Sequence, residues 1–360
     1  MLRPVSSQPW GTDPDGKPVE LWTLRHPSGA IARISTWGAT LTSLRMPLAD
    51  GSARETVLGF ESLDGYLGDH PYIGAAVGRF ANRIAHGRFE LEGRAYALAA
   101  NAAGHHLHGG ERGLSRRTWS ARAGEGALAP GESSAPWLTL SCTSPDGEDG
   151  YPGALDVELR YVLDGHALRL DWTATADAPT PVNLTHHAYF NLGEPGGDVL
   201  GHRLRVRAER FLPVDAGLIP TGELRPVAGT PMDLRAPRPI GEAIAGDDPQ
   251  LRAGGGFDHC WVLADAPGPL RPAATLVAPD GALELRMATT EPGVQVYSGN
   301  FLDGTLRGPG DVPWPKHGGL CLEAQRFPDS PNRSEFPDTI LRPGRVYRQT
   351  TVYAFEKAAR

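Results

Sequence analysis

Polar and apolar residues alternate along much of the chain, and this period of two limits the possible folds more than any other feature. In residues 155–163 every second residue is apolar, and the alternation resumes at residues 168–172 after Asp164-Gly165, a dipeptide typical of a tight hairpin turn. Residues 203–206 alternate arginine with leucine and valine. Because successive side chains of a strand point to opposite faces, the pattern predicts antiparallel strands with one packed and one solvated face.

Turn-forming residues are frequent and helical patterns are rare. The chain contains 45 glycines and 33 prolines, which suit many tight turns and disfavour long helices. Only residues 239–246 suggest even a short helix, and residues 123–136 are predicted to form a long surface loop that is too short for a domain linker. The sequence contains no internal repeat of fixed period, which argues against a propeller or solenoid. The sequence therefore predicts an all-β protein, one large antiparallel β-sandwich forming a single domain over residues 1–360.

Charge and cysteine content exclude several classes of partner. The net charge is −7 and the pI is about 5.9, and no basic stripe is present, which argues against nucleic acid. The three cysteines, Cys142, Cys260 and Cys321, favour neither a disulfide framework nor a zinc knuckle, because their number is odd and their spacing unpaired. The chain shows no secretory signal and no apolar stretch long enough to span a bilayer. We expect a soluble cytoplasmic protein with no membrane partner, a monomer or weak homodimer.

The segment VNLTHHAYFNL (residues 182–192) places two histidines on opposite faces of a predicted strand. His187 shares its face with a hydroxyl and two amides, where its near-neutral pKa suits proton donation. A hydrogen-bonded structural histidine is an equally good interpretation of this segment alone. His186 shares its face with apolar residues, so a structural role is favoured there.

The segment GLCLEAQRF, residues 319–327, embeds a carboxylate in an apolar strand. Alternation sends Cys321, Glu323 and Gln325 to one face. Charged side chains are seldom buried without a partner or a task, and a partly desolvated glutamate with a raised pKa is a competent base. A structural ion pair between Glu323 and an arginine remains the alternative.

A metal site is the alternative chemistry. His106 and His108 lie on one face of a possible strand, and Glu111 follows closely, as in the metal sites of some β-barrel enzymes. With His187 as a third ligand this set would suit zinc or iron. The spacing to Glu111 is short and contains two glycines, so we expect no metal.

Two further segments carry polar groups that suit sugar hydroxyls. Asn82 and Arg83 supply fixed donors, although such a pair more often belongs to a turn or a surface ion pair. Asp258 follows a run of glycines that permits close backbone approach, and a turn or capping role is the default interpretation.

Taken in order, these segments resemble the aldose 1-epimerase family, also called galactose mutarotases. The resemblance extends over almost the whole chain, from about residue 11 to residue 355, and chance agreement of so many ordered blocks is negligible. The matching blocks are ISTWGATLTSLRMP, VLGFESLDGYLGDHPYIGAAVGRFANRIAHGRFELEGRAYAL, LHGG, VNLTHHAYFNL, FDHCWVL, EPGVQVYSGNFL and CLEAQRFPDSPN.

The resemblance implies a fold and a set of site residues. It implies a large antiparallel supersandwich of the galactose mutarotase type, with an open sugar-binding cleft and no cofactor or metal. His187 matches the family's acid and Glu323 its base, and His108 is also expected to polarise the ring oxygen. The residues implied to hold sugar hydroxyls are Asn82, Arg83, His108, Asp258 and Gln295.

The implied reaction interconverts the α and β anomers of free aldohexoses such as galactose and glucose. Opening a cyclic hemiacetal removes the proton of the anomeric O1 hydroxyl and adds one to the ring oxygen O5. Glu323 would take the first proton and protonated His187 would give the second, from opposite sides of C1. The open-chain aldehyde would then turn about C1–C2 and reclose, while the anchored hydroxyls hold the rest of the sugar.

Two departures from the family pattern bear on substrate preference. His186 stands where the family usually has asparagine, and Arg326 stands where a polar residue such as asparagine is common. Relatives acting on sugar phosphates would need cations at the cleft rim, for which Arg326 and Arg333 are the candidates.

One other function class remains open, and a second is disfavoured. A non-catalytic sugar-binding sandwich would use the same fold and hydroxyl-binding residues. A glycoside hydrolase would need two facing carboxylates, whereas these motifs offer one carboxylate and a histidine.

Overall fold

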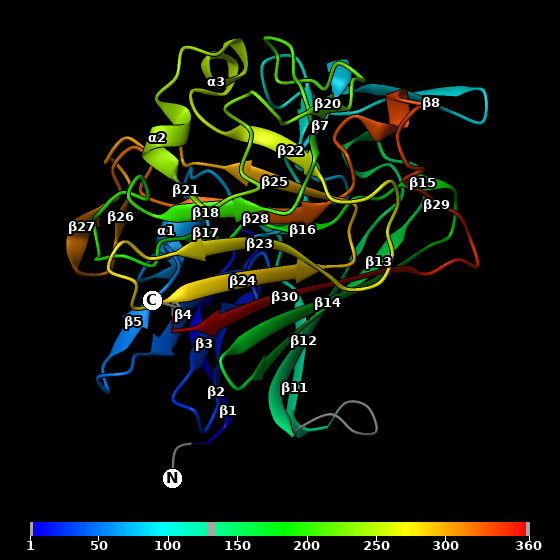
Figure 1. Ribbon diagram of the computed structural model, residues 1–360. Coiled ribbons are helices and arrows are strands. Elements are labelled where there is room, and N and C mark those ends of the chain that lie inside the picture. The colour runs from blue at the N-terminus through cyan, green and yellow to red at the C-terminus, as the bar shows by residue number, and fades with distance from the viewer. Residues whose placement is uncertain (1–2, 128–133, 358–360) are drawn as a thin grey trace.

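The computed structural model describes residues 3–127 and 134–357, and most of its regular structure is antiparallel strand. A nine-stranded sheet extends across the molecule (Figure 1). In sheet order its strands are β11 (Ser120–Gly126), β12 (Ala135–Ser144), β13 (Leu155–Asp164), β14 (Ala167–Ala176), β30 (Tyr347–Glu356), β24 (Glu284–Thr289), β23 (Arg271–Val277), β18 (Arg203–Val206) and β21 (Arg238–Pro239).

Two further large sheets complete the framework. The six-stranded sheet consists of β17 (Tyr189–Phe190), β28 (Leu320–Gln325), β25 (Gly293–Tyr297), β22 (Asp258–Val262), β19 (Arg210–Leu212) and β20 (Arg225–Pro226). The five-stranded sheet is formed by consecutive N-terminal strands, β1 (Val5–Thr12), β2 (Pro18–Arg25), β3 (Ile31–Ser35), β4 (Leu41–Pro47) and β5 (Ala53–Glu55), and lies at the blue end of the colour bar in Figure 1.

Short elements connect these sheets. The two-stranded pairs are β16 (Thr185–His186) with β6 (Ala76–Val77), β10 (His106–Leu107) with β7 (Arg83–Ile84), β8 (Arg88–Leu91) with β9 (Arg94–Ala97), β15 (Thr180–Pro181) with β29 (Ile340–Leu341), and β26 (Arg307–Gly308) with β27 (Val312–Pro313). The α-helices are α1 (Leu63–Leu67), α2 (Ile240–Ile244) and α3 (Pro249–Gly254). The 3-10 turns are η1 (Ala85–Gly87), η2 (Leu114–Arg116), η3 (Glu148–Gly150), η4 (Pro309–Asp311) and η5 (Ser330–Asn332).

One large hydrophobic cluster joins the sheets face to face. It contains Trp172 of the nine-stranded sheet, Leu320 and Leu322 of the six-stranded sheet, and Ile34 of the five-stranded sheet, all of them buried. Alternation along β28 therefore sends its leucines into this core and Glu323 to the opposite face. The predicted all-β antiparallel sandwich is confirmed.

The alternating segments fold as predicted, with one exception. Residues 155–163 and 168–172 lie in β13 and β14, which form the expected hairpin. The prediction of a loop over residues 123–136 is wrong at both ends, because β11 continues to residue 126 and β12 begins at residue 135. Gly124 fits this strand pair because a Cβ there would stand 2.8 Å from the ring of Trp137. Residues 128–133 of that segment lie outside the described part.

The helix predicted within residues 239–246 is confirmed as α2, but two other short helices were missed. The start of α3 carries a recognisable signal, because the side chain of Asp248 accepts a hydrogen bond from the backbone N–H of Gln250 and Pro249 occupies the first turn. Its end carries another, since Gly255 adopts φ +67°. A helix of six residues is too short to show a periodic pattern, which is why alternation alone overlooked it.

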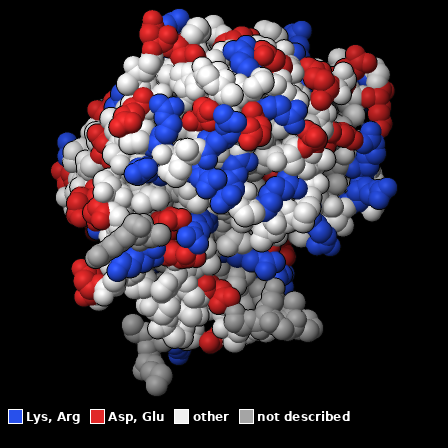
Figure 2. Space-filling model, in the orientation of Figure 1, with Lys and Arg blue, Asp and Glu red and all other residues white. Residues whose placement is uncertain are grey.

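No helix within the described ranges is both long and apolar enough to cross a membrane. On the face shown in Figure 2, basic and acidic side chains are interspersed.

Candidate active site

Adjacent strands of the six-stranded sheet present polar side chains on the face that points away from the large core. We call this the acid–base face and define it by Asp258, Gln295, Cys321 and Glu323. Antiparallel pairing sets Gln295 of β25 directly opposite Glu323 of β28, and all four residues are buried. The period of two that places leucines in the core thus also gathers these groups on one face.

His187 meets the acid–base face from a connecting segment. Its Nε2 lies 3.8 Å from Oε1 of Glu323, and its Nδ1 lies 3.4 Å from Sγ of Cys321. The backbone N–H of His187 donates to the carbonyl of Ala75, and its own carbonyl accepts from the N–H of Gly74. The continuous strand predicted here is wrong, since β16 and β17 are separate and His187 lies between them.

His186 points away from the acid–base face. Its ring contacts the edge of Tyr161 at a centroid distance of 5.8 Å. The residue is buried, and neither ring nitrogen has a hydrogen-bond partner among the residues that the structure describes. His186, which stands where the family usually has asparagine, therefore lies in the interior, as its apolar neighbours in the sequence predicted. It does not contact Glu323.

His108 is brought beside His187 by a strained loop. Its residue has φ +54°, and Asn82, which pairs with it, has φ +62°. The backbone N–H of Asn82 donates to Nδ1 of His108 at 3.1 Å, and the side-chain oxygen of Asn82 accepts from the N–H of Arg83. Gly109 is required after His108, because a Cβ there would stand 1.8 Å from the carbonyl oxygen of Gly78. The rings of His108 and His187 are 5.3 Å apart.

A second polar cluster lies next to Glu323. Nε2 of Gln295 donates to Oδ1 of Asp258 at 2.6 Å, and Nη1 of Arg83 lies 3.9 Å from Oδ2 of Asp258. Two oxygens at this face remain without a partner among the described residues, Oε1 of Gln295 and Oε2 of Glu323. Buried oxygens without partners are costly, so this is a place where ligand hydroxyls would be stabilising.

Burial controls the ionisation of the site. It raises the pKa of Glu323 well above its usual value, with the charge of Asp258 adding to the effect and Arg83 opposing it. Burial lowers the pKa of His187 to about 3 and lowers the pKa of His108 well below its usual value, with the neighbouring His187 and Arg83 contributing. Because burial penalises charged forms, the protein alone favours a neutral carboxyl beside neutral imidazoles. Burial also raises the pKa of Asp258, against the effects of Arg83 and Gln295.

The structure does not support a metal site in which His106 and His108 are both ligands. Nδ1 of His106 lies 2.7 Å from the carbonyl of Ala99, and its Nε2 lies 2.7 Å from the hydroxyl of Tyr151. Both nitrogens of His106 are thus engaged away from His108. A different trio, His108, His187 and Glu323, brings its ligand atoms within 4.8 Å of one another.

The two arginines considered for a sugar phosphate are occupied elsewhere. Nε of Arg326 lies 2.9 Å from Oε2 of the buried Glu291. Arg333 pairs with Asp329 at 3.2 Å and donates to the carbonyl of Pro220. Neither guanidinium contacts the acid–base face through these bonds, so they give the sugar-phosphate hypothesis no support.

Aromatic residues around His187 were missed by sequence reasoning. Tyr189 stacks on His187 at a centroid distance of 5.1 Å, and Tyr72 lies 4.6 Å from His108 and 5.9 Å from His187. The position of Tyr189 on the face of His187 was a usable signal. Tyr72 offers none, because its φ of +56° and its contacts depend on the tertiary structure.

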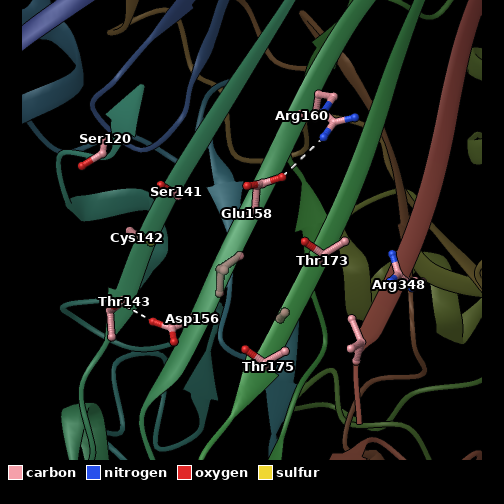
Figure 3. Close-up of a pocket in the computed structure, with 13 residues that line it drawn as sticks. Ser120, Ser141, Cys142, Thr143, Asp156, Glu158, Arg160, Thr173, Thr175 and Arg348 are labelled. Atoms are coloured by element: carbon pink, nitrogen blue, oxygen red, sulfur yellow. Dashed lines mark hydrogen bonds and ion pairs between the residues drawn. The ribbon is translucent and has the colours of Figure 1, made fainter. Parts of the chain in front are cut away.

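A hollow of about 710 Å³ lies elsewhere, over β12, β13 and β14 (Figure 3). Its polar side chains pair with one another, Thr143 with Asp156 and Glu158 with Arg160. We call this the outer face and define it by the residues Ser141, Thr143, Asp156, Glu158 and Arg160. It contains neither His187 nor Glu323, and its size alone does not make it the reaction site.

Known proteins with related sequences and structures match the whole chain. The family model of aldose 1-epimerase covers residues 20–354. Galactose mutarotase of Rattus norvegicus is 44% identical over 344 residues, 95% of this chain and 96% of the relative. Aldose 1-epimerase of Escherichia coli (strain K12) is 39% identical over 345 residues, again 95% and 96%. The crystal structure of galactose 1-epimerase from Lactobacillus acidophilus has a TM-score of 0.85 at 29% identity, with 99% of each chain covered. The chain therefore belongs to the aldose 1-epimerase family, as the ordered motifs predicted, and is an isomerase of the epimerase type.

Proposed function

We propose that this protein interconverts the α and β anomers of free aldohexoses, galactose and glucose among them, with Glu323 as base and His187 as acid. The observation that carries the proposal is the approach of Nε2 of His187 to Oε1 of Glu323, 3.8 Å, on a buried face where Oε2 of Glu323 has no partner within residues 3–127 and 134–357. Ring opening moves one proton from O1 and another to O5. A carboxylate and an imidazole are the groups that exchange protons near neutral pH when their environment is tuned.

The distance changes one detail of the expected mechanism. Groups on opposite sides of C1 would have to be separated by the sugar itself, and 3.8 Å leaves no room for a pyranose between His187 and Glu323. O1 and O5 are bonded to the same carbon, however, so neighbouring acid and base groups reach both oxygens from one edge of the ring. Glu323 then contacts O1 while His187 contacts O5 beside it.

His187 and Glu323 share one titrating proton, and its position depends on whether a sugar is bound. In the protein alone burial favours the proton on Glu323 and a neutral His187. A sugar whose O1 hydroxyl donates to the carboxylate and whose O5 accepts from the imidazolium stabilises the ionised arrangement, because hydrogen bonds to a charged form favour that form. No proton from solvent is required, and the pair titrates as a unit.

The remaining residues orient the sugar. Nδ1 of His108 accepts from a backbone N–H, which leaves Nε2–H as a donor for the ring oxygen or a hydroxyl. Asp258, Gln295 and Arg83 form a connected set that can bind hydroxyls through the open oxygen of Gln295 and the charges of the other two. Asn82 supports His108 and completes the hydroxyl-binding set. An open cleft over these groups, the absence of a metal or cofactor and a cytoplasmic location belong to the same proposal.

Polarimetry tests the proposal directly. Freshly dissolved α-galactose and α-glucose change their optical rotation slowly in buffer, and the protein should accelerate this change in proportion to its concentration. Other aldoses, measured in parallel, define the preference. A change that is no faster with protein than without it, for every sugar, would remove the function, and sugar binding without acceleration would favour a non-catalytic binding protein.

A further inference from the structure

The acid histidine has a thiol as its second hydrogen-bond partner. Cys321 belongs to β28, two residues before Glu323, and is fully buried. Its Sγ lies 3.4 Å from Nδ1 of His187, while Nε2 of the same ring faces Glu323. The imidazole is therefore held between a thiol at one nitrogen and the carboxyl group at the other.

The other neighbours of the imidazole contact its faces and edges. Their polar atoms are engaged elsewhere, since the hydroxyl of Tyr189 donates to the carbonyl of Pro71 and the hydroxyl of Tyr297 accepts from the N–H of Phe301. Over the ranges 3–127 and 134–357, Cys321 is thus the side chain hydrogen-bonded to Nδ1. The rings around His187 are those of Tyr72, His108, Tyr189 and Tyr297.

We infer that Cys321 is a positioning residue that keeps proton exchange at Nε2 of His187, because its sulfur accepts from Nδ1–H both when the ring is neutral and when it is protonated. This inference rests on the proposed role of His187. A thiol sulfur accepts weakly, which is enough to hold the Nδ1 proton in both states. The imidazolium then gives up only its Nε2 proton, and the neutral ring carries its proton on Nδ1 and turns the free Nε2 toward Glu323 and the sugar.

A thiol suits this position because it stays uncharged. Burial raises the pKa of Cys321 well above its usual value, and the charges of Glu323 and Asp258 add to the effect. A carboxylate in the same place would stabilise the imidazolium and oppose proton donation to the sugar. An uncharged partner that accepts from Nδ1–H in both states allows His187 to gain and lose its Nε2 proton with little change around it.

His108 shows the contrasting arrangement. Its Nδ1 faces the backbone N–H of Asn82, a group that can only donate. Protonation of His108 at Nδ1 would place two N–H groups against each other, so this ring is held neutral with its proton on Nε2. The partner at Nδ1 therefore separates the two histidines, one able to change protonation state and one fixed as a donor.

Kinetics of three single variants test the inference. Cys321→Ala should lower kcat by about five- to tenfold, the size expected when one orienting hydrogen bond is lost, with KM for galactose unchanged because Cys321 does not contact the sugar. Cys321→Ser should restore most of kcat, since a hydroxyl oxygen also accepts from Nδ1–H. Cys142→Ala, which removes a thiol beside the outer face, should leave both constants unchanged. Equal rates for the Ala variant and the wild type would overturn the inference.

Nitrogen NMR of the histidine rings separates positioning from a merely structural effect. In protein labelled with ¹⁵N-histidine, with the His187 signals identified by their loss in His187→Gln, the neutral ring should carry its proton on Nδ1 in the wild type and the Ser variant. In Cys321→Ala it should become a mixture of tautomers, while His108 is unchanged and reports that the site is folded. An Nε2 proton on the neutral ring of the wild type, or an unaltered tautomer in the Ala variant, would contradict the inference. Failure of the wild type to accelerate anomer exchange would instead contradict the proposed function and leave the tautomer result intact.

Discussion

Two strand faces of this molecule carry polar side chains, and they differ in how those side chains are satisfied. On the outer face the side chain of Glu158 is 31% exposed and lies 2.7 Å from Arg122, with Arg160 nearby. On the acid–base face the side chain of Glu323 is 2% exposed, and one of its oxygens has no partner in the described part of the chain. The polar groups around the hollow of the outer face are paired with one another, whereas the acid–base face contains a buried oxygen whose hydrogen-bonding capacity is unused among the described residues.

The difference shows what identifies a reaction site in this fold. Exposed ion pairs contribute little to stability, and the carboxylates of the outer face are held in such pairs and hydrogen bonds. Burial on the acid–base face shifts the pKa of Glu323 upward and that of His187 downward, which brings a carboxyl and an imidazole into competition for one proton. Ionisation and unsatisfied bonding potential, rather than the volume of a hollow, indicate the chemistry.

Replacing the buried carboxyl should give the largest effect. Glu323→Gln keeps the shape of the side chain but cannot accept the O1 proton, so kcat for anomer interconversion should fall roughly a hundred- to ten-thousandfold. Polarimetry with galactose measures the loss. Binding of galactose, measured by calorimetry, should persist.

The matched control lies on the outer face. Glu158→Gln makes the same chemical change at an exposed, paired carboxylate, and its kcat should equal that of the wild type. Comparable losses in both variants would remove the distinction between the two faces, and full activity of Glu323→Gln would remove Glu323 as the base.

Much of the acid–base face was predictable because alternation is a local property. The sequence assigned Glu323 to the face opposite the leucines of β28, and the structure places it there. It also assigned His187 to a polar face, and the ring of His187 meets Glu323 although the predicted strand is broken at His187. The ordered motifs predicted the family, which is confirmed. The single domain over residues 1–360 and the roles of the site residues stay predictions.

What the sequence did not contain are the distances between remote segments. Cys321 and His187 are 134 positions apart, and no local pattern reveals that a thiol would meet Nδ1. The break in the strand at His187 and the positive φ of Tyr72 likewise depend on tertiary packing. The placement of acid and base relative to C1 likewise depends on a distance between remote segments rather than on a local pattern.

Removing the charge next to Glu323 should give an intermediate effect. Asp258→Asn keeps an oxygen for Gln295 but loses the charged acceptor near Arg83, so KM for galactose should rise about tenfold, which is about 1.4 kcal/mol. Initial-rate polarimetry over a range of galactose concentrations measures this. On the outer face Asp156→Asn, next to Thr143, should leave KM unchanged; an equal rise there would indicate a nonspecific effect of lost charge.

The buried carboxyl should also reduce stability at high pH. The pKa of Glu323 in the folded protein is raised above its value in the unfolded chain. Its contribution to the free energy of unfolding is therefore fully present below the unfolded pKa and is lost as pH rises toward the folded pKa. Glu323→Gln avoids this loss, and its advantage in free energy of unfolding should grow by up to about 1.4 kcal/mol per pH unit above pH ~4.5. Urea unfolding at pH 5 and pH 8 measures the gap. A gap for Glu323→Gln that shrinks with pH would reverse the sign of the assigned shift.

Chelation should have no effect on the rate, although the acid–base face holds a trio that suits a metal. His108, His187 and Glu323 bring their ligand atoms within 4.8 Å, but both Nδ1 atoms are already hydrogen-bonded, so a metal would have to take Nε2 of each ring and the carboxylate. Those are the atoms that donate to the sugar and exchange its protons. Protein treated with EDTA should therefore keep its full rate in polarimetry, and added Zn²⁺ should inhibit by competing with the proton. Activity that disappears with the metal and returns with Zn²⁺ would convert the acid–base face into a metal centre.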